Sequence, residues 1–259
     1  MKIKRTNENR YVALDDRDMK IGYCSVTRKE LPWIFADVPA QYVIKVSCDD
    51  ECRDVLCGAA VTRARLLAMK EQAPSRVFAD LDPKDVRELE TLKALGFTRT
   101  DGINRMTRRV TDERITLPVP VHCTIVRDFL ENEDERKKCL RRYNDCFGEN
   151  RDMAWLMKLT SRRDFARILI VSPSELCGEV MVWSQGYTGV IGIIQVARAW
   201  RRKGVGSYLV EDARKYFASI GMRDITFDVW LSAPGSLPLA RKCGFRRGEM
   251  IRQYPTLEI

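Results

Sequence analysis

The chain has 259 residues, of which 45% are hydrophobic and 31% charged, so it can bury one large core or two modest ones. The N-terminal residues contain no apolar segment typical of a signal peptide, and no apolar run reaches the roughly 18 residues of a membrane span, so a cytoplasmic location without membrane partners is expected. The net charge of +9 predicts an anionic partner, but the basic clusters alternate with acidic residues, a pattern that disfavours nucleic acid.

Cysteine and histidine do not indicate a metal site or a catalytic triad. Three of the nine cysteines, Cys48, Cys52 and Cys57, lie close together in sequence, but they have no Cys-x-x-Cys spacing and no histidine partner. We therefore expect no metal and interpret them as buried, reduced thiols. The single histidine, His122, lies beside Pro118 and Pro120 in linker-like sequence, which disfavours triad chemistry.

The first hundred residues predict a small α/β unit. Strands are expected at 20–26, 33–36 and 42–48, and residues 53–58 are interpreted as a turn. A helix is expected from Ala59 to about Gln72, where Pro74 ends it, followed by a strand at 76–81. A second helix should begin after Asp82 and end near Gly96.

Residues 110–121 contain two prolines and are expected to connect two domains, at 1–112 and 121–259, through a linker at 113–120. Beyond the linker the pattern predicts helices at 128–147 and 151–160, then strands at 166–171, 179–183 and 190–196. A glycine turn, a helix at 205–220, a strand at 225–230 and a helix at 237–243 complete the chain.

One offset of 148 residues relates the two halves. It pairs Arg53 with Arg201, Gly58 with Gly206, Asp80 with Asp228, Gly96 with Gly244, Phe97 with Phe245 and Arg99 with Arg247. Because the pairs follow one order of turn, helix, strand and helix, we interpret the chain as a tandem duplication. The first copy is truncated and is expected to lack the opening strand and helices of the second.

The sequence at 199–209 is typical of a phosphate-binding turn. Three consecutive cations precede Gly204-Val205-Gly206, with an apolar strand candidate before them and an amphipathic helix after. Glycines allow backbone N–H groups to approach an anion, and the N-terminus of a helix attracts negative charge. The alternative is an ordinary turn whose cations form a solvated surface.

These residues resemble the GNAT superfamily of N-acetyltransferases. The family's central motif is an apolar strand ending in Val, followed by Arg/Gln-x-x-Gly-x-Gly/Ala at the start of a helix, and the sequence from Val196 to Gly206 fits it. Of a second motif, Leu239 and Gly244-Phe245 match, while Ala233 and Ala240 replace an asparagine and a tyrosine. The resemblance implies an α/β (α+β) fold of two tandem GNAT-like units, each a mixed central sheet flanked by helices.

The resemblance also implies acetyl-coenzyme A (acetyl-CoA) as the acyl-donor substrate and an amine-bearing acceptor. In the first copy Leu56 stands at the position that corresponds to Gly204. A side chain is therefore expected where the backbone must approach the pyrophosphate, and the first copy is expected not to bind acetyl-CoA. In the second copy the backbone of Val196 is expected to contact the pantetheine arm and to polarise the thioester carbonyl. The pyrophosphate site implied by the family comprises Arg201, Arg202, Lys203, Gly204, Val205, Gly206 and Ser207, with Leu239 beside it.

Direct attack by an amine requires a base, because an alkyl ammonium has a pKa of about 10. Glu179 and Asp228 are the nearest candidates, and each has a structural carboxylate as its alternative interpretation. Ala240 removes the family's tyrosine acid; Tyr254, Ser236 or Ser232 are open replacements. A non-catalytic acyl-CoA sensor or adaptor is therefore the alternative to an N-acetyltransferase, and the acceptor and a homodimer are left open.

Overall fold

The computed structural model describes residues 1–29, 38, 40–111, 117, 120 and 122–259. They form two compact units, which we call unit 1 (Met1–Ile103, Trp230–Ser232 and Met250–Ile259) and unit 2 (Asn104–Val229 and Ala233–Glu249). The expected strand at 33–36 and most of the expected linker at 113–120 lie outside the described residues, so the domain limits drawn from the sequence stay a prediction. No helix in the described ranges is long and apolar enough to cross a membrane.

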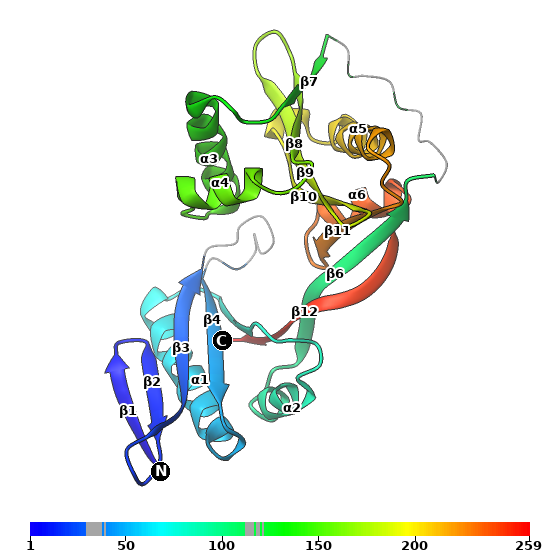
Figure 1. Cartoon of the computed structure of the whole chain (residues 1–259). Coiled ribbons are helices and arrows are strands. Elements are labelled where there is room, and N and C mark those ends of the chain that lie inside the picture. The colour runs from blue at the N-terminus through cyan, green and yellow to red at the C-terminus, as the bar shows by residue number, and fades with distance from the viewer. Residues whose placement is uncertain (30–37, 39, 112–116, 118–119, 121) are drawn as a thin grey trace. The chain divides into compact units, whose positions relative to one another are not determined.

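Unit 1 is a mixed sheet with two helices packed on one face (Figure 1). The strands β1 (Lys2–Asn7), β2 (Arg10–Leu14), β3 (Lys20–Lys29) and β4 (Ala40–Cys48) pair antiparallel in that order, and β5 (Ser75–Ala79) pairs parallel with β4. A short 3-10 helix, η1 (Asp50–Cys52), leads into α1 (Arg53–Glu71), and α2 (Val86–Ala94) follows β5. The apolar sides of α1 and α2 bury one continuous core against the sheet.

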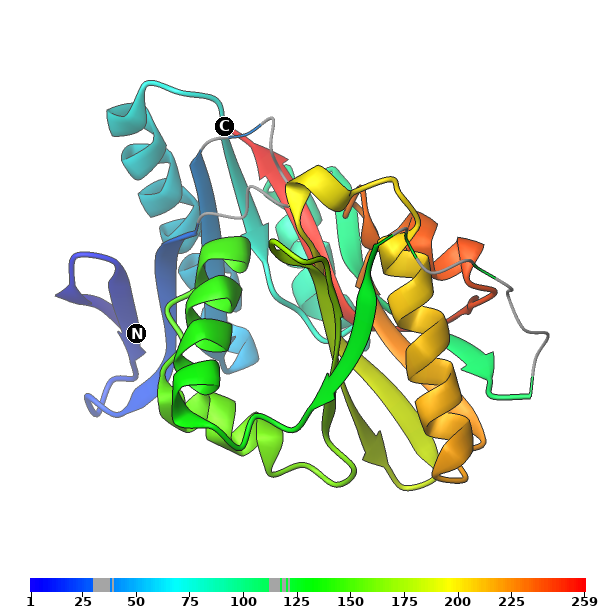
Figure 2. The same ribbon diagram turned by 90° about the horizontal axis from the view of Figure 1, so that it is seen from above.

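Unit 2 repeats this order and adds two helices. The strands β7 (Thr124–Asp128), β8 (Ala166–Val171), β9 (Leu176–Gln185) and β10 (Thr188–Val196) pair antiparallel, and β11 (Asp224–Trp230) pairs parallel with β10. The helices are α3 (Glu133–Phe147) and α4 (Met153–Thr160) between β7 and β8, η2 (Arg198–Trp200) and α5 (Val205–Ser219) after β10, and α6 (Ser236–Lys242) after β11. Figure 2 shows α5 and α3 on opposite faces of the strands β8 and β9, each over its own apolar cluster.

The offset of 148 residues found in the sequence also relates helices and strands of unit 1 to those of unit 2. The strands β4 and β10, and the short helices η1 and η2, begin and end at positions 148 apart, and α1 and α5 end at such positions. The predicted mixed α/β fold with two tandem units is confirmed. The expectation that the first copy lacks an opening strand is wrong, because β1 occupies that place. Within residues 1–14 a two-residue turn joins β1 to β2, where unit 2 has α3 and α4 between β7 and β8.

The interpretation of residues 53–58 as a turn is also wrong, since α1 begins at Arg53. Leu56 and Cys57 are completely buried in the unit 1 core, so this segment gains an apolar face by becoming helical. The helix expected at 128–147 begins only at Glu133, because Asp128 ends β7 and Asn132 caps the helix by accepting from two backbone N–H groups.

Two long strands, β6 (Arg99–Arg109) and β12 (Arg246–Glu258), were not predicted from the sequence. In unit 1, the end of β12 pairs antiparallel with β5, so the last strand of the second repeat completes the sheet of the first unit. In unit 2, the later part of β6 is the neighbour of β11, where Arg105 forms an ion pair with Asp228. The repeats therefore exchange their last strands.

Candidate functional site

The N-terminus of α5 has the geometry of an anion-binding site. Its N-cap residue, Gly204, has φ = +86°, a left-handed conformation that glycine adopts without strain. No side chain caps this helix and no acidic residue lies in its first turn, whereas Asp85, Asn132 and Asp152 cap α2, α3 and α4. The first N–H groups of α5 therefore have no partner within the helix and face outward at the positive end of its dipole.

Gly206 allows β10, α5 and α6 to converge at this point. A Cβ atom at position 206 would lie 3.3 Å from Cδ2 of Leu239 and 3.6 Å from Cγ2 of Val196. Three residues from the two predicted motifs thus lie together around the start of α5.

The loop before α5 is held to the strands by side chains. Arg201 Nε donates to the carbonyl oxygen of Val196 at 3.2 Å, and the indole N–H of Trp200 donates to Glu175 Oε1 at 2.7 Å. The ammonium of Lys203 lies 5.3 Å from the centroid of the Trp200 ring. The exposed cations of this loop are Arg201, Arg202 and Lys203. They surround the helix terminus with positive charge and leave it open to solvent.

The strands β10 and β11 separate beside the site. In the described residues their parallel pairing ends at Ile191 and Phe227, whereas β10 continues along β9 as far as Val196. A bulge at Gly192 marks the separation, and a Cβ there would lie 1.7 Å from the ring of Trp183. The last residues of β10 consequently have one edge that β11 does not cover.

The backbone N–H of Val196 faces this uncovered edge. The N–H of the next residue, Ala197, donates to the carbonyl oxygen of Cys177 at 2.9 Å, so position 197 points toward β9. Because backbone groups of successive strand residues point to opposite neighbours, the N–H of Val196 is directed away from β9. It is the backbone donor of the last residue of β10.

Glu179 is completely buried, and both of its carboxylate oxygens are engaged. Arg167 Nε donates to Oε2 at 2.5 Å, Arg142 Nε donates to Oε1 at 3.1 Å, and the side-chain amide of Gln195 also donates to Oε1. Arg167 in turn pairs with Asp128 at 2.9 Å. This network orients Gln195, the residue before Val196. No sequence pattern predicts this network, because its members come from five different elements.

Asp228 lies one residue beyond the last β10–β11 pair, and its side chain is 39% exposed. Arg105 binds both of its oxygens, at 3.0 and 3.2 Å. Its neighbours Phe227 and Val229 belong to the core beneath α5, so Asp228 lies on the opposite face of β11.

Ala240 stands at the position of the family's tyrosine and has no hydroxyl group to donate a proton. Its side chain is completely buried in the unit 2 core. Of the suggested replacements, Ser236 is the half-buried first residue of α6, while Ser232 and Tyr254 belong to unit 1. Burial raises the pKa of Tyr254 to about 12.

In unit 1 the corresponding end of α1 is acidic. Arg53, the counterpart of Arg201, pairs with Asp50 and Glu88 at 3.2 Å each, and Asp54 lies in the first turn. Burial and the neighbouring Asp85 raise the pKa of Glu88 to about 7. Carboxylates therefore lie at the start of α1, whereas cations lie at the start of α5.

The expectation for Leu56 is corrected in one respect. Its side chain is buried in the core of unit 1 and does not stand at the exposed terminus of the helix. The first copy loses the anion-site geometry because residues 53–58 are helical.

A comparison with protein-family models matches residues 129–245 to the acetyltransferase (GNAT) family, a segment that runs from the end of β7 through α6. The matched segment, which spans less than half of the chain, is similar to the GNAT family and carries the motifs noted in the second of the two tandem units.

Solved structures share this fold across nearly the whole chain. A GCN5-related N-acetyltransferase from Sphaerobacter thermophilus is 15% identical with a TM-score of 0.54, and the match covers 99% of this chain and 82% of that one. A tandem GNAT protein from the clavulanic acid biosynthesis pathway is 13% identical with a TM-score of 0.53, covering 96% and 82%. A probable N-acyltransferase from Enterococcus faecalis V583 is 15% identical with a TM-score of 0.61, covering 95% and 61%. A comparison with curated protein sequences finds no match.

Proposed function

We propose that the chain is an acetyl-CoA-dependent N-acetyltransferase with one working site, in unit 2, that acetylates a primary amine by direct attack in a ternary complex. The observation that supports this proposal is the uncapped N-terminus of α5, with Gly204 in the left-handed region and Gly206 against Val196 and Leu239. A pyrophosphate fits such a terminus because it accepts several N–H hydrogen bonds and carries the charge that the helix dipole favours.

The loop and the first turn of α5 would hold the pyrophosphate. Their backbone N–H groups are the donors, and the exposed cations 201–203 supply charge. The residues in this role are Arg201, Arg202, Lys203, Gly204, Val205, Gly206 and Ser207, with Leu239 packed beside them. When bound, acetyl-CoA supplies a thioester whose carbonyl carbon an amine can attack.

Val196 would supply one backbone donor for the thioester oxygen. Its N–H faces the edge of β10 that β11 leaves uncovered, where the pantetheine arm can lie along the strand. Removing one such donor from a comparable site costs about 2.7–4 kcal/mol of transition-state stabilisation.

We assign the base to Asp228. Glu179 is buried with three donors on its two oxygens, so it is better suited to positioning Gln195 than to accepting a proton. The carboxylate of Asp228 reaches solvent where β11 leaves β10, and it can take the proton of the ammonium group directly or through water. The C–S bond then breaks, and a thiol with a pKa of about 8.5 can depart as thiolate without the acid that Ala240 lacks.

Binding is tested by substituting the N-cap of α5. Asp and Asn both tolerate the left-handed conformation and both cap a helix, but only Asp places a negative charge where the pyrophosphate would bind. We expect acetyl-CoA to raise the melting temperature of the native chain and of Gly204→Asn, and not that of Gly204→Asp. An equal shift in both variants contradicts the assignment of the site.

Turnover is tested by measuring free-thiol release from acetyl-CoA across a panel of primary amines. The buried Ala240 is the observation that favours the second candidate function, a non-catalytic acyl-CoA sensor. Release that depends on one class of amine supports the enzyme. Thermal stabilisation by acetyl-CoA with no release for any amine supports the sensor.

A further inference from the structure

The helix α1 is apolar on two opposite sides. One side is buried in the unit 1 core, through residues that include Leu56, Cys57 and Ala60. The other side carries apolar or small residues at alternating intervals of four and three, the spacing that places residues on one side of a helix. They are Val55, Ala59, Thr62, Leu66 and Met69, and we call them the α1 stripe. A helix on the surface of a protein normally presents polar residues on its outer side, so the stripe is suited to contact with a partner.

The large side chains of the stripe are exposed. Val55 is 46% exposed, Leu66 is 48% exposed and Met69 is 73% exposed. Ala59 and Thr62 lie between them and are small. Because the distance between two packed helices depends on the side chains at the contact, a second helix can approach closely at these two positions.

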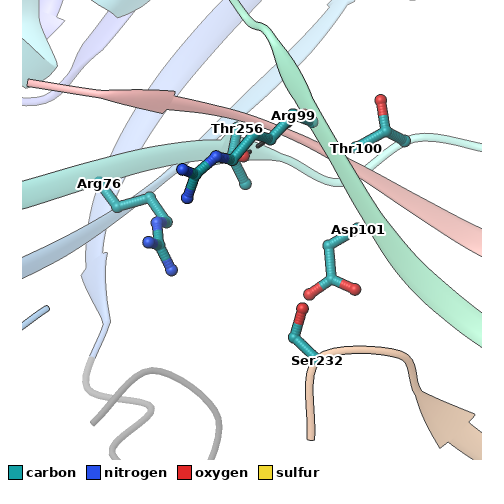
Figure 3. Close-up of a pocket in the computed structure, with 6 residues that line it drawn as sticks. All are labelled: Arg76, Arg99, Thr100, Asp101, Ser232 and Thr256. Atoms are coloured by element: carbon teal, nitrogen blue, oxygen red, sulfur yellow. Dashed lines mark hydrogen bonds between the residues drawn. The ribbon is translucent and has the colours of Figure 1, made fainter. Parts of the chain in front are cut away.

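A hollow of ≈ 610 Å³ continues the stripe past the end of α1. Five of the eight residues that line it are apolar, namely Ala68, Met69, Ala73, Pro74 and Ile259. Another hollow in unit 1, of ≈ 320 Å³, is lined by polar residues alone (Figure 3). Of these two, the hollow at the end of α1 is therefore the one that suits an apolar side chain.

Charge is divided between the two ends of α1. Residues 50–54 include three acids and one base, whereas residues 63–71 include three bases and one acid. Asp54 and Arg65 are both exposed, and their separation of about three helical turns places them along the same edge of the stripe. A second α1 helix packed antiparallel would bring the acidic end of each copy beside the basic end of the other. A parallel helix would bring like charges together.

We propose that two copies of the chain associate through unit 1, with their α1 helices packed antiparallel across a two-fold axis. Asp54 of each copy pairs with Arg65 of the other, and Val55 of each copy packs beside Met69 of the other, at the hollow. The segment 59–62 lies midway between 54 and 65 and also midway between 55 and 69, so both pairs require nearly the same axis. The small residues of the stripe lie on that axis, where the helices approach most closely. One surface supplies both members of every pair, as a two-fold contact requires.

The dimer should be reversible. A helix of 19 residues is about 28 Å long, which is short for the interface of a permanent dimer. The fraction of dimer should therefore rise with the concentration of the chain. None of the residues in this contact belongs to the acetyl-CoA site proposed above, so the test needs no acetyl-CoA and is independent of the proposed acetyltransferase activity.

The test is sedimentation equilibrium of the full chain from micromolar to millimolar concentration. We expect a monomer–dimer equilibrium. Leu66→Glu and Met69→Glu should each raise the dissociation constant at least about tenfold, because the two-fold axis repeats every apolar contact that is lost. Both residues are exposed, so both variants should fold, which circular dichroism verifies. The matched control is Met157→Glu, which changes an exposed methionine on α4 of unit 2 and should leave the dissociation constant unchanged.

An exchange of charges tests the antiparallel arrangement. Asp54→Arg and Arg65→Asp should each weaken the dimer at least about fivefold, because each variant alone places like charges opposite each other in both pairs. An equimolar mixture of the two variants should associate as tightly as the native chain, since every pair in the mixed dimer joins opposite charges. The chain that carries both substitutions should do the same.

Three results would overturn the proposal. The first is a chain that stays monomeric at millimolar concentration, which would mean that a different partner covers the stripe. The second is a dimer whose dissociation constant is unchanged by both Leu66→Glu and Met69→Glu. The third is a mixture of Asp54→Arg and Arg65→Asp that associates no more tightly than either variant alone.

Discussion

The sharpest test of the difference between the two repeats is the same substitution at equivalent glycines, Gly206→Ala and Gly58→Ala. Gly58 lies inside α1, and a Cβ there would meet nothing within 4 Å. Alanine in a helix interior is more stable than glycine by about 0.5–1 kcal/mol. For a chain of this length that corresponds to a rise of about 1–4 °C in melting temperature.

At Gly206 the same methyl group meets Leu239 at 3.3 Å and Val196 at 3.6 Å. The gain in helix propensity and the cost of crowding are each about 1 kcal/mol and oppose each other, so the stability of the free chain should change little. The methyl group would, however, narrow the space proposed for acetyl-CoA. We expect the affinity for acetyl-CoA to fall at least tenfold.

The assay is thermal unfolding with and without acetyl-CoA. A ligand at 100 times its Kd stabilises a protein by about 2.7 kcal/mol, or about 5–10 °C here. A tenfold weaker Kd reduces this to about 1.4 kcal/mol, or about 3–6 °C. Gly58→Ala should retain the full ligand shift on a higher baseline. The reasoning is refuted if Gly58→Ala loses the shift or if Gly206→Ala keeps it entirely.

Three further predictions concern the carboxylates. Glu179→Gln should lower stability by about 3–5 kcal/mol in thermal or denaturant unfolding, because it leaves the buried charge of Arg167 with fewer partners; a loss below 1 kcal/mol would contradict the network. Asp228→Asn should lower kcat/KM by about 10²–10⁴-fold while the acetyl-CoA thermal shift is retained. A loss of that thermal shift would show a structural role instead. Burial raises the pKa of Glu88 from 4.5 to about 7. Between these pH values Glu88 holds a proton in the folded chain and has released it in the unfolded chain. The free energy of unfolding should therefore fall as the pH rises from 5 to 7. Glu88→Gln should remove that decline in melting temperatures measured across this range, and an unchanged decline would mean that another group causes it.

The amino-acid sequence by itself determined the repeat and the position of the anion site. The 148-residue offset follows from local signals, namely glycines at helix ends and the periodicity of apolar residues, and these signals act over a few residues whatever the tertiary structure. The start of α5 was predictable for the same reason, since Gly204 and Gly206 specify backbone geometry directly.

Other features depended on partners that are distant in sequence. The residues 53–58 resemble a turn in isolation, yet they are helical because the unit 1 core buries Leu56 and Cys57. The charged strands β6 and β12 have weak strand signals, and each is stabilised by neighbours from the other repeat.

The candidate bases also show what the sequence determined and what only the tertiary structure decided. Both carboxylates proposed as bases were visible in the sequence, but only the tertiary structure surrounded Glu179 with arginines from α3 and β8 and left Asp228 partly open to solvent. The pairing of β5 with β12 has no signal in the sequence at all. It exists because strand exchange brings Thr256 and Glu258 next to Arg76, 180 residues or more away along the chain, and hydrogen bonding between strands does not depend on that separation.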